Sequence, residues 1–419
     1  MRIAVVSSFS HSVGGVETYL ESLMPKLVEG GHTVGFWHEH EAPSGSRSIV
    51  PAGVPTGHIG ESANELAAAI QKMRHWCPHV IFLQGLTSVA RELPLLDVAP
   101  LVTFLHAYNG TCISGTKTHA FPHAHACSRP LGPACLVHYF PRRCGGWSPL
   151  TLVSAYREQR TRQHLLQGSV AVATLSDHMR RECIAQGIDP ARVIHLPAFV
   201  PMSGPSAAPA PATDGATGDH HDGLHIGFVG RFEQLKGPAL LLDAVEKLKA
   251  RLLRPLRVTL VGDGRERARC ERKASAIEGP DLEIRMPSWL APADVRELFA
   301  TLDLLVVPSI WPEPLGLVGL EAAAAGVPAV AFDVGGIREW LSDDVTGRLI
   351  REAPSAEALA QAIAESLADP SRLARWGAAA REHSRARTVD RHVQELELLL
   401  ARAAATSRVA STLPAAAHA

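Results

Sequence analysis

The hydrophobic positions of this chain form short apolar runs that alternate with segments of helical periodicity. In the first half, runs with the length of buried strands lie at 2–7, 33–37, 80–83, 101–105, 170–175 and 193–196. In the second half they lie at 224–229, 257–261, 284–286, 302–307, 327–332 and 346–350. We expect the last run to be a hairpin-like strand. The other runs predict βαβ units and parallel sheets.

Apolar residues at helical spacing fill the segments between these runs. Leu20, Leu23 and Leu27 recur every three or four residues, which is typical of one helix face. Such spacing, with capping residues such as Ser176, predicts helices at 16–28, 63–74, 177–186, 238–251, 265–276, 294–300, 315–325, 355–367, 370–381 and 389–405.

The two series of strands and helices predict two domains, as the length of 419 residues also suggests. The segment 201–222 is rich in Ala, Pro, Gly and Asp without periodicity, and is expected to be a linker. The first domain is then 1–200, with an irregular insertion at about 107–162, and the second is 223–385. The last helix, 386–405, is expected to pack back on the first domain, and the tail 406–419 to be disordered.

The charge balance argues against a nucleic-acid binder. The chain has 41 Lys and Arg against 42 Asp and Glu, and its pI is near 7.1. No apolar run is long enough to span a bilayer, and the first residues read as a strand rather than as a signal peptide. A cytoplasmic protein is therefore expected, with a peripheral membrane contact left open by the Arg-rich segment 142–162, for which a solvated helix face is the other reading.

Candidate chemistry is concentrated between Ser309 and Gly326. Pro312 and Pro314 exclude a helix interior, so Glu313 is expected in a loop at the carboxyl end of the strand 302–307. Ligands of open α/β sheets bind at this kind of strand–loop–helix junction.

A helix that begins at about Leu315 would leave the amides of Leu315 and Gly316 free to bind an anion. Glu313 and Glu321 can each accept hydrogen bonds from pairs of hydroxyls. Anion-binding amides beside hydroxyl-binding carboxylates indicate a sugar nucleotide. The alternative is an ordinary helix start with two solvated acids.

Three further loops carry candidate ligand-binding residues. Gly14 and Gly15 follow the first strand, where the lack of a Cβ would allow a phosphate or sugar to approach the backbone, although a simple turn explains them equally well. Arg231 and Lys236 flank the loop after the strand 224–229 and can neutralise a diphosphate. His106 follows the strand 101–105 and can donate to a sugar hydroxyl or to a leaving phosphate, or be structural.

The insertion holds four cysteines, namely Cys112, Cys127, Cys135 and Cys144. Four thiolates can hold a structural zinc ion, but the spacing is wide and contains no Cys-x-x-Cys pair. Disulfides are disfavoured in a reducing compartment, and buried thiols are the simplest alternative. We expect the insertion to shape an acceptor site.

Taken together, the motifs resemble those of the retaining glycosyltransferases of family 4, which have the GT-B fold: two Rossmann-like αβα domains that face each other across a cleft. The resemblance covers most of the chain. The matching segments are Gly14-Gly15 with Glu17, Gly31-His-Thr-Val34, Gly230-Arg231 with Lys236-Gly237, Val261-Gly-Asp-Gly264, and Glu313-Pro-Leu-Gly with Glu321, the Glu-x7-Glu signature.

The resemblance implies a role for each matching residue. Arg231 and Lys236 would bind the donor diphosphate, with Gly14 and Gly15 closing over it. The other implied contacts are Glu321 to the ribose, Glu313 with the backbone of Leu315 and Gly316 to the transferred sugar, and His106 near its reacting face. The resemblance thus implies that Glu313, His106, Arg231 and Lys236 would carry catalysis, with no metal or other cofactor.

The implied reaction transfers a sugar from a UDP- or GDP-sugar to a hydroxyl of a glycan or lipid-linked acceptor, in glycan, polysaccharide or glycolipid biosynthesis. Ala107 stands where the family often has Asp, and Leu315 where Phe is common. Two alternatives remain: a sugar-nucleotide epimerase or other enzyme on the GT-B fold, and an inactive binding partner. The second would have lost motif residues that are all present here.

Overall fold

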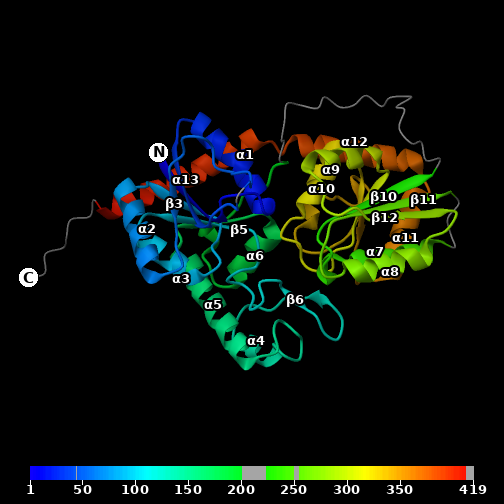
Figure 1. The fold of residues 1–419 in the computed structure, drawn as a ribbon, viewed down its shortest axis with the longest axis horizontal. Coiled ribbons are helices and arrows are strands. Elements are labelled where there is room, and N and C mark those ends of the chain that lie inside the picture. Colours follow the sequence, from blue (N-terminus) through cyan, green and yellow to red (C-terminus); the bar gives the residue numbers. More distant parts are fainter. Residues whose placement is uncertain (44, 201–222, 250–253, 412–419) are drawn as a thin grey trace, which may run out of the picture. The chain divides into compact units, whose positions relative to one another are not determined.

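The computed structural model describes residues 1–43, 45–200, 223–249 and 254–411 (Figure 1). The chain divides into two compact units. Within the described residues, unit 1 comprises 1–117, 128–200 and 389–411, and unit 2 comprises 118–127 and 223–388. The predicted linker, 201–222, and the last residues, 412–419, lie outside the described residues.

Unit 1 is built on a seven-stranded parallel sheet in the order β3-β2-β1-β4-β5-β8-β9. The strands are β1 (Arg2–Phe9), β2 (Thr33–His40), β3 (Thr56–His58), β4 (Val80–Leu83), β5 (Leu101–Leu105), β8 (Ala171–Thr174) and β9 (Val193–His195). Strands β4, β5 and β8 are buried at every position, as expected of central strands covered on both faces. The sequence predicted all of these strands except β3.

Helices cover both faces of this sheet (Figure 1). One face carries α2 (Ala63–Trp76), α3 (Val89–Glu92), η1 (Leu93–Asp97) and α5 (Pro149–Gly168). The unit also holds α1 (Gly15–Glu29), α6 (Asp177–Ala185), η2 (Pro190–Arg192) and α13 (Val389–Ser411). Ser62 caps α2 and Ser176 caps α6, each by accepting a backbone N–H three residues further on.

The final helix, α13, packs on the rest of unit 1 through buried apolar side chains and ion pairs, and a buried histidine adds two hydrogen bonds. Nε2 of His392 is 2.8 Å from the hydroxyl of Tyr19 on α1, and its Nδ1 is 2.8 Å from the carbonyl oxygen of Pro197. Burial lowers the pKa of His392 to about 4, so the ring is neutral at pH 7. A neutral ring donates through one nitrogen and accepts through the other, and both partners are therefore satisfied.

Unit 2 contains a six-stranded parallel sheet in the order β12-β11-β10-β13-β14-β15. The strands are β10 (Leu224–Val229), β11 (Leu256–Val261), β12 (Leu282–Arg285), β13 (Leu304–Val307), β14 (Ala329–Phe332) and β15 (Gly347–Ile350). The helices are η3 (Gln234–Lys236), α7 (Pro238–Lys249), α8 (Arg267–Ile277), α9 (Pro292–Thr301), α10 (Leu317–Ala325), η4 (Ile337–Glu339), α11 (Ala356–Leu367) and α12 (Pro370–Arg385). Helices α7, α8 and α11 cover one face, and α9, α10 and α12 the other (Figure 1).

Three predictions about the elements are wrong. The run 346–350 is not hairpin-like, because β15 pairs in parallel with β14. Helix α10 begins at Leu317 rather than at Leu315, since Gly316 has a left-handed backbone (φ +85°) and ends the loop. The last helix continues to Ser411, into the segment expected to be disordered.

The predicted insertion contains more regular structure than the sequence indicated. It holds β6 (Thr118–His119) and β7 (His125–Ala126), which pair antiparallel, then α4 (Ala134–His138) and most of α5. A small apolar cluster of Ile113, Leu131 and Tyr139 packs with Cys135, Cys144 and neighbouring side chains. In the described residues no helix is long and apolar enough to cross a membrane.

The loops at the carboxyl ends of the unit 2 strands pack backbone against backbone. A Cβ on Gly237 would lie 2.2 Å from the carbonyl oxygen of Pro308, and one on Gly262 would lie 2.0 Å from that of Gly230. These loops follow β10, β11 and β13. Only glycine allows them to approach so closely, and both positions also have a positive φ.

Gly237→Ala should therefore destabilise unit 2 by about 2–4 kcal/mol, because an alanine adds a clash with fixed backbone to the strain of φ +75°. The matched control is Gly31→Ala at φ +77°, where an added Cβ meets nothing within 4 Å, with an expected cost of about 1 kcal/mol. Urea denaturation of both variants gives the comparison. Equal costs would show that the loop contact contributes nothing.

The buried neutral histidine predicts a pH dependence of stability. His392 titrates at about 4 when folded and near 6.5 when unfolded, so its contribution is present above pH 6.5 and is lost as pH falls toward 4. His392→Gln should reduce the slope of unfolding free energy against pH in this window by up to about 1.4 kcal/mol per pH unit. The exposed His75→Gln is the control, and an unchanged slope in the His392 variant would contradict the assignment.

Candidate functional site

The loop between β13 and α10 holds a buried ion pair. Nζ of Lys236 lies 2.7 Å and 2.9 Å from the two carboxylate oxygens of Glu313, and the Ser309 hydroxyl donates to one of them at 2.5 Å. Glu313 is 3% exposed, whereas Lys236 remains partly accessible. A buried carboxylate needs such partners, because an unpaired one would cost several kcal/mol. The structure therefore brings together two residues that the sequence nominated separately.

The backbone around Glu313 is held by the turn that follows β14. The amide of Gly336 donates to the carbonyl oxygen of Glu313 at 2.7 Å, and the indole N–H of Trp340 donates to that of Leu315 at 2.8 Å. A Cβ on Gly335 would lie 2.2 Å from the Glu313 carbonyl oxygen, so this turn also depends on glycine. Hydrogen bonds from the Gly336 amide and the Trp340 indole thus hold the backbone at Glu313 and Leu315.

The amides of Leu315 and Gly316 donate no hydrogen bond to any described residue, and they precede the first turn of α10. The side chain of Leu315 is buried. Although α10 begins two residues later than expected, unpaired amides at this position suit an anion or a hydroxyl oxygen.

Glu321 lies on α10 and is half-buried. Burial raises the pKa of its carboxyl to about 7, against a smaller opposing effect of the Arg296 charge. No hydrogen bond joins this carboxyl to another described residue. Arg231, in the loop after β10, is exposed and likewise makes no side-chain hydrogen bond within the described chain. Both groups are therefore available to a ligand.

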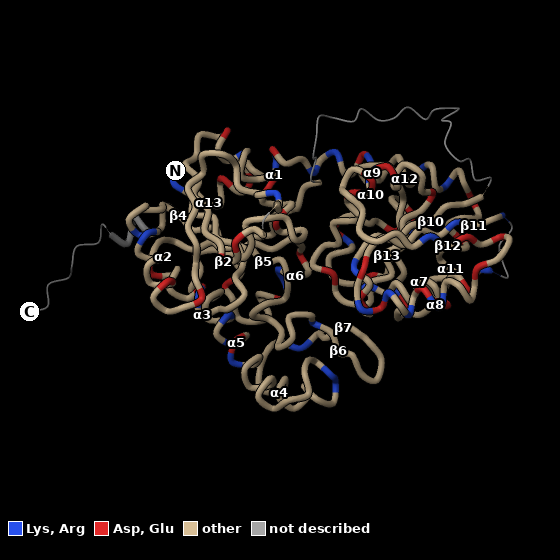
Figure 2. The backbone as a smooth tube through the Cα atoms, viewed as in Figure 1, with Lys and Arg blue, Asp and Glu red and all other residues tan. Residues whose placement is uncertain are grey.

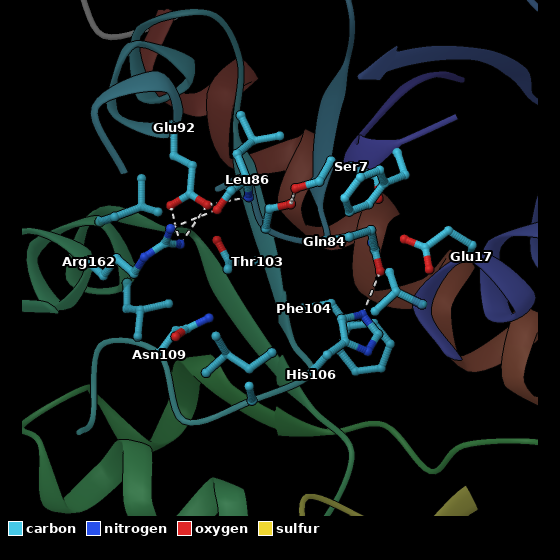
Figure 3. A pocket seen from close by; sticks show the side chains of 18 residues that line it. Ser7, Glu17, Gln84, Leu86, Glu92, Thr103, Phe104, His106, Asn109 and Arg162 are labelled. Atoms are coloured by element: carbon cyan, nitrogen blue, oxygen red, sulfur yellow. Dashed lines mark hydrogen bonds and ion pairs between the residues drawn. The ribbon is translucent and has the colours of Figure 1, made fainter. Parts of the chain in front are cut away.

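Unit 1 has its own pocket of about 260 Å³ at the carboxyl ends of β1, β4 and β5 (Figure 3). Its polar lining includes Ser7, Gln84, Thr103, His106 and Asn109. The sequence nominated only His106 among them. Gln84 follows one predicted strand and Thr103 lies in another. Their position near a strand end was the only feature of the sequence that could have marked them as pocket residues.

His106 is neutral in this pocket. Burial, with a smaller effect of His392, lowers its pKa to about 4. Its Nε2 lies 2.8 Å from Oε1 of Gln84, which assigns the proton to Nε2 and leaves Nδ1 as an acceptor. The Nε2 atom of Gln84 is buried without a partner. A neutral ring can exchange hydrogen bonds with a hydroxyl, but it brings no positive charge to a phosphate.

An ion pair that sequence reasoning missed forms another part of the pocket wall (Figure 3). Nη1 of Arg162 lies 2.7 Å and 2.8 Å from the carboxylate oxygens of Glu92, and its Nη2 donates to the carbonyl of Leu86 at 2.7 Å. Glu92 is fully buried, and burial raises its pKa despite the opposing arginine. The two residues are far apart in sequence, so no local pattern could have linked them.

Gly14 and Gly15 begin α1 in unit 1. The amide of Gly14 donates to the Glu17 carboxylate at 2.9 Å, which is the half of a capping box that needs no side chain at the N-cap. Gly14 has an extended backbone (φ −168°), and a Cβ there would make only an ordinary contact with Glu17. The structure therefore explains Glu17 as a helix cap. Neither the backbone conformation nor the packing of the protein without a ligand requires a glycine at position 14.

The part of the chain that the structure describes does not bring the four cysteines of the insertion together at one point. Among the described residues, no group of three or more His, Cys, Asp or Glu side chains is placed to hold a metal ion. Cys135 and Cys144 instead pack against the apolar cluster around Tyr139, and Cys112 is buried, with its sulfur accepting from the amide of Lys117. Packing and this hydrogen bond account for three of the four thiols, so the arrangement lends no support to structural zinc, which stays a prediction.

This chain resembles known proteins in two ways. A family model matches the sequence of most of unit 2, and solved structures match the fold of nearly the whole chain. Residues 214–383 match the family model described as glycosyl transferases group 1. The D-inositol 3-phosphate glycosyltransferase of Kineococcus radiotolerans is 33% identical over 240 residues, or 52% of this chain and 54% of that protein. The enzyme of the same name from Geodermatophilus obscurus is 35% identical over 236 residues, 54% and 50% of the two chains. This chain thus spans about half the length of these relatives.

Solved structures match along nearly the full length. Sucrose-phosphate synthase from Thermosynechococcus elongatus superposes with a TM-score of 0.68 at 19% identity, covering 97% of this chain and 99% of that one. HepE from Anabaena, solved in complex with UDP, gives 0.66 at 17% identity, with 96% and 100% covered. At this identity the likeness concerns the fold, which is GT-B: two Rossmann-like domains. Lys236, Glu313 and Glu321 thus lie within the residues that match the group 1 family model, in a chain with the GT-B fold.

Proposed function

We propose that this protein transfers a sugar, with retention of anomeric configuration, from a nucleotide-diphosphate sugar to an acceptor hydroxyl. The observation that carries the proposal is the buried Lys236–Glu313 pair, which lies at a strand–loop–helix junction within the region matched by the family model. The proposal gains support from the relatives named glycosyltransferases and from HepE, a protein of the same fold solved with UDP. The donor is a UDP- or GDP-sugar.

In this proposal unit 2 binds the donor. Lys236 and Arg231 bind the diphosphate, and Glu321 accepts hydrogen bonds from the ribose hydroxyls. Glu313, with the amides of Leu315 and Gly316, contacts hydroxyls of the transferred sugar. The cationic side chains and the amides supply the positive potential that the leaving diphosphate requires, so no metal ion or other cofactor is needed.

The Lys236–Glu313 geometry suggests how the charge is used. An ammonium group has three N–H donors, and the two carboxylate oxygens of Glu313 occupy at most two of them. The third can point to a phosphate oxygen while Glu313 holds the amine in place. Charge that develops on the diphosphate as the glycosidic bond breaks then meets a fixed cation. The acceptor hydroxyl attacks the anomeric carbon from the same face as the departing diphosphate and gives its proton to the phosphate oxygen that leaves, so no protein nucleophile is required.

Unit 1 binds the acceptor in this proposal. Its pocket presents a neutral His106 and an unpartnered amide nitrogen of Gln84, which are suited to the hydroxyls of a sugar or polyol. We assign the acceptor to a glycan or lipid-linked compound of polysaccharide or glycolipid synthesis, reached on the cytoplasmic side of a membrane. Gly14 and Gly15 are proposed to contact the donor diphosphate.

Glu313→Gln and Lys236→Ala should each lower sugar transfer at least about 100-fold, because each removes part of the fixed charge at the reacting centre. The measurement is release of UDP or GDP from a panel of nucleotide sugars, with and without acceptor. The control is Lys247→Ala, which removes a lysine from an exposed ion pair with Glu357.

Circular dichroism must show that both variants fold, since Lys236→Ala leaves a buried carboxylate with one partner fewer. Near-normal turnover in either folded variant would remove this site assignment. Interconversion of the donor sugar without any acceptor would instead indicate an epimerase.

The raised pKa of Glu321 predicts a pH-dependent donor affinity. Its carboxylate form accepts hydroxyl hydrogen bonds best, so the donor KM should rise as pH falls from 8 to 6, through the value of about 7. Glu321→Gln should raise the donor KM about tenfold at pH 8 and remove this pH dependence, with little change in kcat.

Stability provides an independent check on the same group. A carboxyl whose pKa is raised by folding destabilises the native state as pH increases from about 4.5 to about 7. Glu321→Gln should therefore melt about 2–4 °C above the wild type at pH 8 and at the same temperature at pH 4.5. The same difference in melting temperature between variant and wild type at both pH values would contradict the raised pKa of Glu321.

A further inference from the structure

The outermost part of unit 1 is a small tip that exposes large apolar side chains. It consists of α4 and the first turns of α5, which extend away from the sheet of unit 1 (Figure 1). Leu150 is 82% exposed, Val137 72% and Trp147 69%; Leu136 and Val153 are also exposed. Isolated exposed apolar residues are common, but five within eighteen consecutive positions form a feature that calls for a partner.

These side chains are not required by the fold of the tip. Leu152, Ala155 and Tyr156 of α5 pack against the cluster of Ile113, Leu131 and Tyr139. Leu150, Val153 and Arg157, spaced by three and four residues, share the opposite face of the helix. The inner apolar face of the tip is therefore covered by this cluster, whereas the apolar side chains of its outer face are exposed to solvent.

The charge around this outer face is one-sided. Residues 98–157 contain no Asp or Glu, although the whole chain has nearly equal numbers of acidic and basic residues. Arg143 and Arg157 are exposed, Arg142 is half-exposed, and the guanidinium of Arg143 lies 5.3 Å from the centre of the Trp147 ring. Figure 2 shows the basic residues of the tip without an acidic one on α4.

We propose that this tip docks on the surface of an anionic lipid bilayer. Trp147, Leu150, Val153 and Val137 enter the boundary between headgroups and acyl chains, where an indole is favoured and aliphatic side chains leave water. Arg142, Arg143 and Arg157 pair with lipid phosphates. The segment 98–157 that holds them contains no carboxylate, and the next one, Glu158, bonds the Val89 amide and Arg162.

A lipid surface fits both properties of the tip. An acidic protein partner would satisfy the arginines, but it would not by itself account for the aliphatic side chains. A neutral apolar partner would leave the arginines without counter-charges in the interface. Docking of this kind is independent of the proposed sugar transfer, and it would bring a lipid-borne acceptor to unit 1.

The test is flotation of the full-length protein with vesicles, without nucleotide or acceptor. Vesicles of phosphatidylcholine with an equal share of phosphatidylglycerol should bind the wild type, and vesicles of phosphatidylcholine alone should bind at least tenfold less. Binding should weaken between about 0.05 M and about 0.5 M NaCl, since salt screens the arginine–phosphate pairs.

Two double variants separate the apolar and charged contributions. Leu150→Gln/Val153→Gln and Arg143→Gln/Arg157→Gln should each reduce the vesicle-bound fraction about tenfold, and the second should also lose most of the salt dependence. The matched controls are Leu398→Gln, an exposed leucine of α13, and Arg272→Gln, an exposed arginine of α8; both should bind like the wild type.

Unchanged melting temperatures would show that the variants fold. This is expected, because the substituted side chains are exposed and lie outside the cluster of Ile113, Leu131 and Tyr139. Wild-type binding by both double variants, equal binding to neutral vesicles, or no binding to any vesicle would overturn the proposal. Soluble polyglutamate that binds the tip as tightly as the vesicles, with the same dependence on Leu150, would indicate an acidic protein partner instead. Sugar transfer with a soluble acceptor is measured separately, so failure of docking leaves the proposed reaction untouched.

Discussion

The site in unit 2 depends on the close approach of backbone segments at one edge of its sheet. Gly237, Gly262 and Gly335 each face a carbonyl oxygen at a distance that no Cβ could share. Without that contact, the loop after β10 would stand further from the loop after β13. Lys236 would then lose the short hydrogen bonds that hold it against Glu313. The Lys236–Glu313 ion pair thus depends on glycines that let the two loops approach each other closely.

Burial has a common effect on the ionisable groups of both units. It raises the pKa of Glu321 and lowers that of His106, in each case toward the neutral form. Where a charge is kept, it is matched: Glu313 has Lys236, and Glu92 has Arg162. Unit 2 therefore offers fixed charge and unit 1 offers mainly neutral hydrogen-bonding groups, a division that suits a charged donor and a hydroxylated acceptor in the proposed reaction.

The insertion illustrates how one sequence pattern can fit two kinds of chemistry. Four cysteines are compatible with zinc, and in the structure the thiols of Cys135 and Cys144 pack in a small apolar cluster between α4 and α5. Packing this cluster fixes one face of α5 and leaves the other with Leu150, Val153 and Arg157. No bounds were predicted for α5, although a helix face was one reading of 142–162, because polar and apolar residues are mixed around this helix.

The sequence by itself determined most strands and helices, because buried parallel strands are short apolar runs and capping residues mark where helices begin. It also placed Glu313 in a loop at a strand end, since Pro312 and Pro314 exclude a helix there. Only the tertiary structure decided that Lys236 meets Glu313, that Gln84 fixes the His106 proton and that Arg162 neutralises Glu92. Each pair is separated by 22 to 77 residues, so its formation depends on strand order and loop packing, which local periodicity does not encode.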